Sequence, residues 1–176
     1  ALAVFCLGCP QNGTPSNTTW YAVKVVLDGD TIILADERRV RYLGIDTPEL
    51  GHGAKPDQPF SREARDVNAS LVKKSKVSLS FEKDRRDRYG RSLAYVTNQE
   101  GVVVNLELIR QGAAFYLADA SLERKLDRQM LKTQRKAMQE RVGMWQDWQE
   151  PPVPRGGYVG NRRSRRFHHP DCREAR

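Results

Sequence analysis

The pattern of apolar and polar residues predicts that the body of this chain, residues 20–150, begins with strands. Runs rich in β-branched residues alternate with turn signals, of which Asp-Gly-Asp at 28–30 is the clearest. Pro48 has no amide hydrogen and restricts the residue before it, so a strand has to end there. Five strands are expected, over residues 21–27, 31–35, 40–45, 77–81 and 93–97.

Helical spacing follows the third strand. Phe60, Ala64, Val67 and Leu71 lie four, three and four residues apart, which places them on one face of a helix. Residues 50–59, before this helix, are rich in Gly and Pro and predict a loop. Two more helices are expected, over residues 105–111 and 121–140, the second with a face of Leu122, Leu126, Met130, Thr133 and Ala137.

Five short strands with a helix after the third are compatible with a small, strongly curved barrel of the oligonucleotide-binding (OB) type. The expected class is therefore α+β, mainly a β-barrel. The sequence contains no internal repeat, no Gly-rich phosphate loop and no paired Cys-x-x-Cys. No apolar run approaches the roughly 18 residues of a membrane-spanning helix, which excludes a polytopic membrane protein.

The first nine residues, ALAVFCLGC, are apolar and end in small residues around a cysteine. They resemble the end of a bacterial lipoprotein signal peptide, with Cys9 as the lipidated residue. An ordinary cleaved signal and a buried strand are the alternatives. Residues 10–19 contain no large apolar side chain and predict a flexible tether. We therefore expect an exported protein, either secreted or anchored to a bacterial membrane as a lipoprotein.

Most of the excess positive charge lies in the C-terminal segment of the chain. The 30 Lys and Arg residues outnumber the 22 Asp and Glu residues, and the net charge of +8 suggests a polyanionic partner. Three prolines at 151, 152 and 154 stop any helix, and residues 155–176 hold seven Arg against two acids. Residues 151–176 therefore predict a basic tail outside the folded body.

Three polar clusters lie at the ends of predicted strands, at residues 28–31, 41–49 and 87–91. Singly, each has a plain structural interpretation as a hairpin turn, a strand-to-loop exit or a solvated hairpin. A barrel could bring them together. They would then supply carboxylates for a hard cation, one further carboxylate and two guanidinium groups, which is the combination that phosphodiester hydrolysis needs.

The same segments carry a family resemblance. VVLDGDT at 25–31, RYLGIDTPE at 41–49 and DRYGR at 87–91 resemble, in order and spacing, the motifs of the thermonuclease (micrococcal or staphylococcal nuclease) family. VNLELIRQG at 104–112 and GMW at 143–145 agree as well. The resemblance covers residues 20–148 and implies a five-stranded OB-fold barrel with three helices. It also implies a Ca²⁺-dependent endonuclease that cleaves DNA, with RNA as a further candidate substrate, without sequence specificity and leaves 3′-phosphates.

The resemblance assigns the metal and water chemistry to the first two clusters. Asp30 and Asp46 match the two calcium-ligating aspartates, and the backbone carbonyl of Thr47 matches a further ligand. Glu49 matches the carboxylate that activates the attacking water. A carboxylate that only positions or polarises water would look the same in the sequence.

The resemblance assigns phosphate binding to four residues. Arg41 and Arg91 match the arginines that hold the scissile phosphate, and bidentate contact to phosphate oxygens suits arginine. Arg88 and Tyr89 match a Lys-Tyr pair that contacts a neighbouring phosphate, with Arg keeping the charge of Lys.

One departure concerns base stacking. The family places two tyrosines after the RQG turn, where this chain has Ala118 and Ala120, while aromatic residues occur earlier, as Phe115 and Tyr116. Either the alignment shifts locally or base stacking is altered, so base preference and the balance between DNA and RNA stay open.

The tail resembles a short His-x-x-x-Cys element appended to some bacterial nucleases. His168, His169 and Cys172 are candidate zinc ligands, although a tetrahedral site needs four. The alternative is an exposed basic tail that binds phosphate without sequence preference.

Two other functions compete with the nuclease. A non-catalytic OB-fold module would bind single-stranded nucleic acid by stacking and charge alone, but this chain retains every catalytic position of the motifs. A tethered envelope protein that holds anionic lipid would account for the tail and not for the body. We expect a monomer that acts on nucleic acid.

Overall fold

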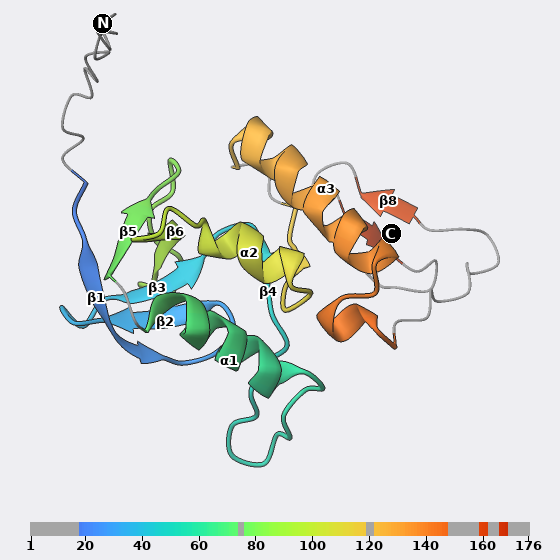
Figure 1. Cartoon of the computed structure of the whole chain (residues 1–176), viewed down its shortest axis with the longest axis horizontal. Helices are drawn as coiled ribbons and strands as arrows, with labels where there is room; N and C mark the ends of the chain where they lie inside the picture. The colour runs from blue at the N-terminus through green and yellow to red at the C-terminus, as the bar shows by residue number, and fades with distance from the viewer. Residues whose placement is uncertain (1–17, 74–75, 119–121, 148–158, 162–165, 169–176) are drawn as a thin grey trace, which may run out of the picture.

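The computed structural model describes residues 18–73, 76–118, 122–147, 159–161 and 166–168. A curved barrel forms one part of the folded body, and three helices lie beside it, with α2 between the barrel and α3 (Figure 1). The structure thus has the α+β organisation expected from the sequence.

Five strands close the barrel in the order β1-β2-β3-β6-β5. All neighbours pair antiparallel except β3 and β6, which pair parallel. The predicted five-stranded barrel is therefore confirmed. Its strands are β1 (Tyr21–Val26), β2 (Thr31–Leu34), β3 (Arg39–Tyr42), β5 (Lys76–Ser80) and β6 (Ser92–Asn98).

The third expected strand is divided in two. β3 ends at Tyr42, and Gly44, with a φ of 70°, turns the chain through the left-handed region that glycine adopts without strain. β4 (Ile45–Asp46) then leaves the barrel and pairs antiparallel with β7 (Phe115–Tyr116). A continuous strand over residues 40–45 was therefore wrong, because the glycine redirects the chain.

The three helices agree with the expected ones to within a few residues, and a short 3₁₀ helix follows them. Helix α2 contacts both α1 and α3, so it forms the centre of the helical layer (Figure 1). The elements are α1 (Ser61–Val72), α2 (Val104–Arg110), α3 (Arg124–Gln139) and η1 (Gly143–Trp145).

The buried face of α1 is centred on a polar residue. Asn68 is fully buried between Ala64 and Val72, while Val67 and Leu71 lie at the edge of the core. The Asn68 side chain accepts a hydrogen bond from the Tyr42 hydroxyl at 2.9 Å and donates one to the backbone carbonyl of Asp28 at 3.0 Å. Because both bonds are made, burial of this amide is tolerated and ties α1 to the turn between β1 and β2.

A second buried asparagine joins α2 to the barrel. The Asn105 side chain accepts the amide hydrogen of Val96 at 2.9 Å and donates to the carbonyl of Leu43 at 2.9 Å. These bonds hold the chain where β3 ends, immediately before β4. The position of β4 therefore depends on α2 as well as on the barrel.

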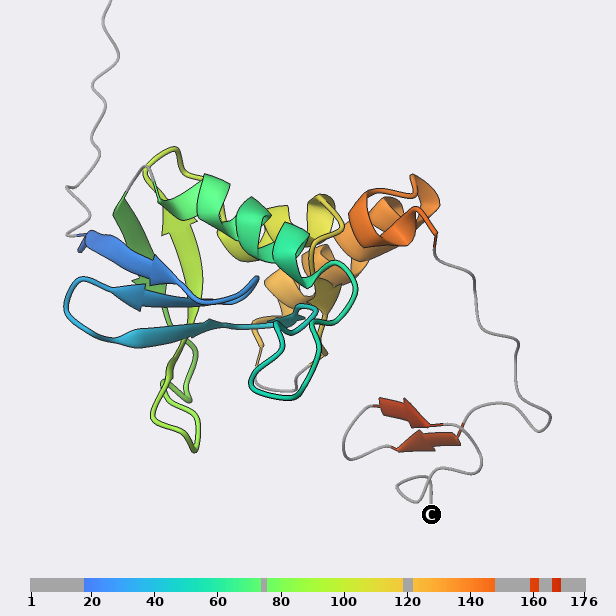
Figure 2. The same cartoon turned by 90° about the horizontal axis from the view of Figure 1, so that it is seen from below.

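The described part of the C-terminal segment is a two-stranded hairpin of β8 (Val159–Asn161) and β9 (Arg166–His168), which pair antiparallel (Figure 2). The candidate ligand His168 ends β9. The signal segment 1–9 with Cys9, and the other candidate ligands His169 and Cys172, lie outside the described residues. Within the described ranges, no helix is long and apolar enough to cross a membrane.

Candidate active site

The turn between β1 and β2 places Asp30 at the start of β2, with its side chain directed inward. The amide of Asp30 donates to the Asp28 carboxylate at 3.0 Å, which fixes the turn. Gly29 packs directly against Thr47, since a Cβ at this glycine would lie 2.8 Å from the Thr47 side chain. The absence of a side chain at Gly29 therefore allows the first and second polar clusters to meet.

Asp30 is a buried carboxylate, 2% exposed, with a full set of donors. Its Oδ2 accepts hydrogen bonds from the amide and the hydroxyl of Thr47, both at 3.0 Å, and its Oδ1 accepts one from Thr31. Burial raises the pKa of Asp30 to about 7, against the opposing effect of the nearby Arg41 guanidinium. A carboxylate held in this way has a strong electrostatic preference for a cation beside it.

Arg41, on β3, joins the first two clusters. Its Nη1 lies 2.6 Å from Asp30 Oδ2, and its Nη2 lies 2.6 Å from Asp46 Oδ1. The Arg41 side chain is 13% exposed and that of Asp46 is 51% exposed, so the pair reaches from the interior to the surface. Asp46 is held in place by β4, where it is paired with Phe115 of β7.

Glu49 begins the loop that leaves β4, and Gln58 closes that loop. The Gln58 side chain accepts the amide hydrogen of Glu49 at 2.8 Å, while the Gln58 amide donates to the Glu49 carbonyl at 2.9 Å. Across the same loop, Gly51 donates its amide hydrogen to the Asp57 carboxylate at 2.9 Å. The backbone of Glu49 is therefore fixed on both sides, although its side chain is exposed.

The third cluster is a turn built around Asp87. Its Oδ1 accepts the amide hydrogens of Tyr89 and Arg91, both at 2.9 Å, and its Oδ2 accepts Arg91 Nε at 2.7 Å. Asp87 thus sets both the fold of the turn and the direction of the Arg91 side chain. Arg88 donates to the Tyr89 hydroxyl at 2.7 Å, and Tyr89 is 69% exposed.

Residues of the second and third clusters line one open cavity of about 680 Å³, and the first cluster adjoins it through the ion pair between Asp30 and Arg41. Arg41 lines it from β3, and Arg88, Tyr89 and Arg91 line it from the turn after β5. Glu49 lies in the same electrostatic neighbourhood. Although much of its side chain is exposed, partial burial of its carboxyl group and the charges of Asp28 and Asp46 raise its pKa, and Arg41 and Arg91 oppose that rise. All three polar clusters predicted from the sequence therefore lie together.

The residues present suit a hard divalent cation. Asp28 raises the pKa of both Asp30 and Glu49, and Asp46 raises that of Glu49, so each of these four carboxylates lies close enough to repel at least one of the others. Their combined charge exceeds that of Arg41. Carboxylate oxygens are the donors that Ca²⁺ takes in proteins. Among the described residues, no three His, Cys, Asp or Glu side chains form a ready-made cluster, so backbone or water oxygens would have to complete a site.

The roles of two residues in the site, Gln58 and Asp87, could not be predicted from the sequence. Gln58 is one polar residue in a loop rich in Gly and Pro, and nothing in its spacing points to Glu49. Asp87 belongs to the cluster at residues 87–91 that the sequence predicts as a hairpin, but its role in orienting Arg91 was not predicted. Its bond to Arg91 depends on side-chain direction.

The aromatic residues at 115 and 116 are engaged elsewhere. The ring of Phe115 packs edge-on against Trp145 with centroids 5.3 Å apart, and the Tyr116 hydroxyl donates to Asp127. On the cavity, the apolar side chain nearest to them in sequence is Leu117, which is 36% exposed. Both aromatic residues thus already have partners within the protein, and neither lines the cavity.

Comparison with known proteins agrees with this arrangement. Residues 39–147 match the family described as staphylococcal nuclease homologue. The chain is 32% identical to a thermonuclease of Staphylococcus hyicus over 136 residues, covering 74% of this chain and 78% of that protein. It is 31% identical to the endonuclease YncB of Bacillus subtilis over 159 residues, covering 88% and 71%. The SPbeta prophage-derived endonuclease YokF of Bacillus subtilis is 36% identical over 140 residues, covering 77% of this chain and 44% of that protein.

Proposed function

The chain belongs to the staphylococcal nuclease family and is a nuclease, and we propose that it is a Ca²⁺-dependent endonuclease that leaves 3′-phosphates. The observation that carries this proposal is the position of Arg41. Its guanidinium is shared by Asp30 and Asp46 on the wall of the cavity that Arg91 also lines. Carboxylates that could bind a cation therefore lie directly beside arginines that could bind a phosphate.

Asp30, Asp46 and the carbonyl of Thr47 are proposed to hold Ca²⁺. The buried Asp30 fits this role because its Thr31 and Thr47 hydrogen bonds fix its oxygens before any ligand arrives. When bound, Ca²⁺ would neutralise phosphate charge and polarise water and a phosphate oxygen.

Glu49 is proposed to accept a proton from the attacking water. The water oxygen bonds to phosphorus, the bond from phosphorus to the 5′ oxygen breaks, and that oxygen takes a proton from solvent, which leaves the phosphate on the 3′ side. The raised pKa of Glu49 makes it a better proton acceptor than an ordinary surface carboxylate. Gln58 contributes by fixing the Glu49 backbone.

Arg41 and Arg91 are proposed to bind the scissile phosphate as its negative charge grows. Arg91 is oriented by Asp87, and Arg41 by two carboxylates, so neither has to be ordered during the reaction. Arg88 and the exposed Tyr89 would contact a neighbouring phosphate. Because the groups facing the cavity bind phosphate rather than base edges, cleavage of both DNA and RNA without sequence preference is expected.

We also propose that the chain acts as an exported monomer. Support for export is the apolar segment that ends at Cys9, with lipidation of Cys9 as one form of it.

The test is degradation of a single-stranded DNA oligonucleotide with Ca²⁺, compared with the same reaction in chelator. Wild-type protein should cleave only with Ca²⁺, and Glu49→Gln and Arg91→Ala should each lower kcat at least a hundredfold. Glu63→Gln, an exposed carboxylate on α1, is the matched control and should cleave normally. Product ends that block polymerase extension until a 3′-phosphatase acts would support 3′-phosphates.

Two results would count against the proposal. Cleavage unaffected by chelator would contradict the metal assignment. Binding of the oligonucleotide without cleavage in Ca²⁺ would instead support the non-catalytic binding module.

A further inference from the structure

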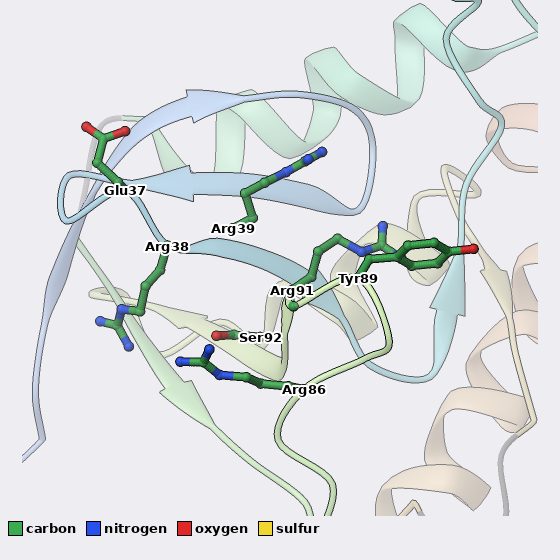
Figure 3. Close-up of a pocket in the computed structure, with 8 residues that line it drawn as sticks. Glu37, Arg38, Arg39, Arg86, Tyr89, Arg91 and Ser92 are labelled. Atoms are coloured by element: carbon green, nitrogen blue, oxygen red, sulfur yellow. The ribbon is translucent and has the colours of Figure 1, made fainter.

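A second cavity, of about 300 Å³, lies beside the candidate active site (Figure 3). Tyr89 and Arg91 line both cavities, so the two are contiguous across the turn at residues 87–91. Four arginines contribute to its wall: Arg38, Arg39, Arg86 and Arg91. This concentration of positive charge is not used by the hydrolytic step proposed above, except through Arg91.

The arginines differ in whether an acid already satisfies them. Arg38 lies 2.7 Å from Asp36, and its guanidinium also stacks over Tyr21 at 4.2 Å from the ring centroid. Arg91 is bonded to Asp87. Glu37, the acid on this wall, is paired with Lys24.

Arg39 and Arg86 are the exposed arginines of this wall for which the described residues provide no acidic partner. Arg39 begins β3, and the backbone of Arg86 pairs with Ser92 at the start of β6, the parallel neighbour of β3. Two unsatisfied guanidinium groups therefore line one cavity, one from β3 and one from the segment beside the start of β6.

Arg39 and Arg86 each lie close to one of the two arginines proposed for the scissile phosphate. Arg39 precedes Arg41 by two residues on β3, so both side chains lie on one face of the strand, with Cα atoms about 7 Å apart. Arg86 lies across the turn from Arg91, because the Asp87 carboxylate accepts hydrogen bonds from the amide and the side chain of Arg91 and so closes the turn. Each arginine proposed for the scissile phosphate thus has an unpaired arginine next to it on the side of the second cavity.

We propose that Arg39 and Arg86 form a second phosphate subsite, which holds a phosphodiester of the same nucleic-acid strand outside the reacting centre. This inference rests on the proposed function, because the strand enters through the active site. The cavity has room for a phosphate with part of its sugar, and guanidinium groups bind phosphate bidentately. The preferred substrate is therefore a strand of several nucleotides rather than a dinucleotide.

The test compares a 12-nucleotide single-stranded DNA with a dinucleotide that contains one phosphodiester. In Arg39→Gln/Arg86→Gln, kcat/KM should fall about tenfold on the 12-mer at low salt, and at least fivefold more than on the dinucleotide. The plot of log kcat/KM against log salt for the 12-mer should become shallower by about 0.7 for each phosphate that the variant no longer binds. Lys132→Gln/Arg135→Gln, which removes the same charge from exposed positions on α3, is the matched control and should leave the salt slope unchanged.

An equal fall on both substrates, or an unchanged salt slope on the 12-mer, would overturn the subsite. If wild-type protein cleaves neither substrate with Ca²⁺, the proposed function fails, and the subsite is then judged by equilibrium binding of labelled 12-mer. A shallower salt dependence of binding in the double variant would support it, and an unchanged dependence would overturn it.

Discussion

The two cavities on either side of the turn at residues 87–91 are both lined by arginines of β3, but these arginines differ in burial and in their acidic partners. In the active-site cavity, Arg41 is held at 2.6 Å by both Asp30 and Asp46 and is 13% exposed. In the second cavity, Arg39, two residues earlier on the same strand, is exposed and has no acidic partner among the described residues. Burial and pairing therefore separate two neighbouring arginines of β3.

The partners of each arginine decide what it can contribute to catalysis or binding. A guanidinium fixed by two carboxylates is oriented in advance, so it can stabilise charge that develops in a transition state. A guanidinium in solvent adds attraction for a polyanion, which salt weakens. Substitution of Arg41, which is paired beside the reacting centre, should therefore lower kcat, whereas substitution of the unpaired Arg39 should change affinity and salt dependence. The experiments below test this contrast.

The largest effect is expected at Arg41. Arg41→Ala should lower kcat about a thousandfold, because it removes an oriented donor to the phosphate in a partly buried site. Single-turnover cleavage of the 12-mer at saturating protein measures this directly. Arg39→Gln under the same conditions should change the rate less than threefold. A loss at Arg41 that appears only in KM would remove the proposed distinction between the two arginines.

A smaller effect is expected at Gln58. Gln58→Ala removes the side-chain acceptor for the Glu49 amide and should lower kcat about tenfold with little change in KM, since small displacements of a reacting group are costly. Gln58→Glu keeps an acceptor oxygen and should restore most of the rate. Gln129→Ala, at an exposed position on α3, is the matched control. Equal losses in Gln58→Ala and Gln58→Glu would show that the hydrogen bond is not responsible.

Asp87 offers a test by pH. Burial raises its pKa, but hydrogen bonds from the Arg91 side chain and from the amides of Arg91 and Tyr89 outweigh that effect and hold the pKa below its ordinary value. A depressed pKa means that the carboxylate stabilises the folded state above the unfolded pKa and loses this contribution as the pH falls through the folded pKa. Urea unfolding should therefore separate wild-type protein from Asp87→Asn by about 1 kcal/mol at pH 7. The gap should narrow towards pH 3, and a gap that widens in acid would contradict the assignment.

The smallest effect is expected at Arg38. It lines the same cavity as Arg39 but is engaged by Asp36 and Tyr21. Arg38→Gln should change cleavage of the 12-mer less than twofold and leave its salt slope as in wild-type protein. A loss as large as that of Arg39→Gln would mean that charge alone, irrespective of pairing, governs the cavity.

Most strands and helices and the three polar clusters were predictable because each depends on local pattern, whereas closure of five strands into a barrel was implied by the family resemblance. β-branched runs, turn residues and helical spacing gave the elements, and clusters at strand ends gave Asp30, Arg41 and Arg91. The division of the third strand was not predicted, because the apolar pattern continues through Gly44 and the turn is visible only in its positive φ.

Polar residues inside the core escaped prediction for another reason. Asn68 looks like a surface residue of α1 until its partners, Tyr42 and the carbonyl of Asp28, are known. The unequal roles of Arg38 and Arg39 are likewise hidden in a dipeptide of identical residues. The partners of Asn68 are distant in the sequence, so local spacing does not encode them. Arg38 depends on Asp36, two residues away, and on the more distant Tyr21, and the direction of its side chain decides that it meets them.

The pairing of β4 with β7 has a consequence for which parts of the chain the site needs. Asp46 lies opposite Phe115, a residue that a ribosome adds only after the five barrel strands and α2. The segments that form all five barrel strands therefore precede, in the chain, the strand that pairs with Asp46. A chain shortened before residue 115 would keep every barrel strand and lose the strand opposite Asp46, so the site depends on residues beyond the barrel.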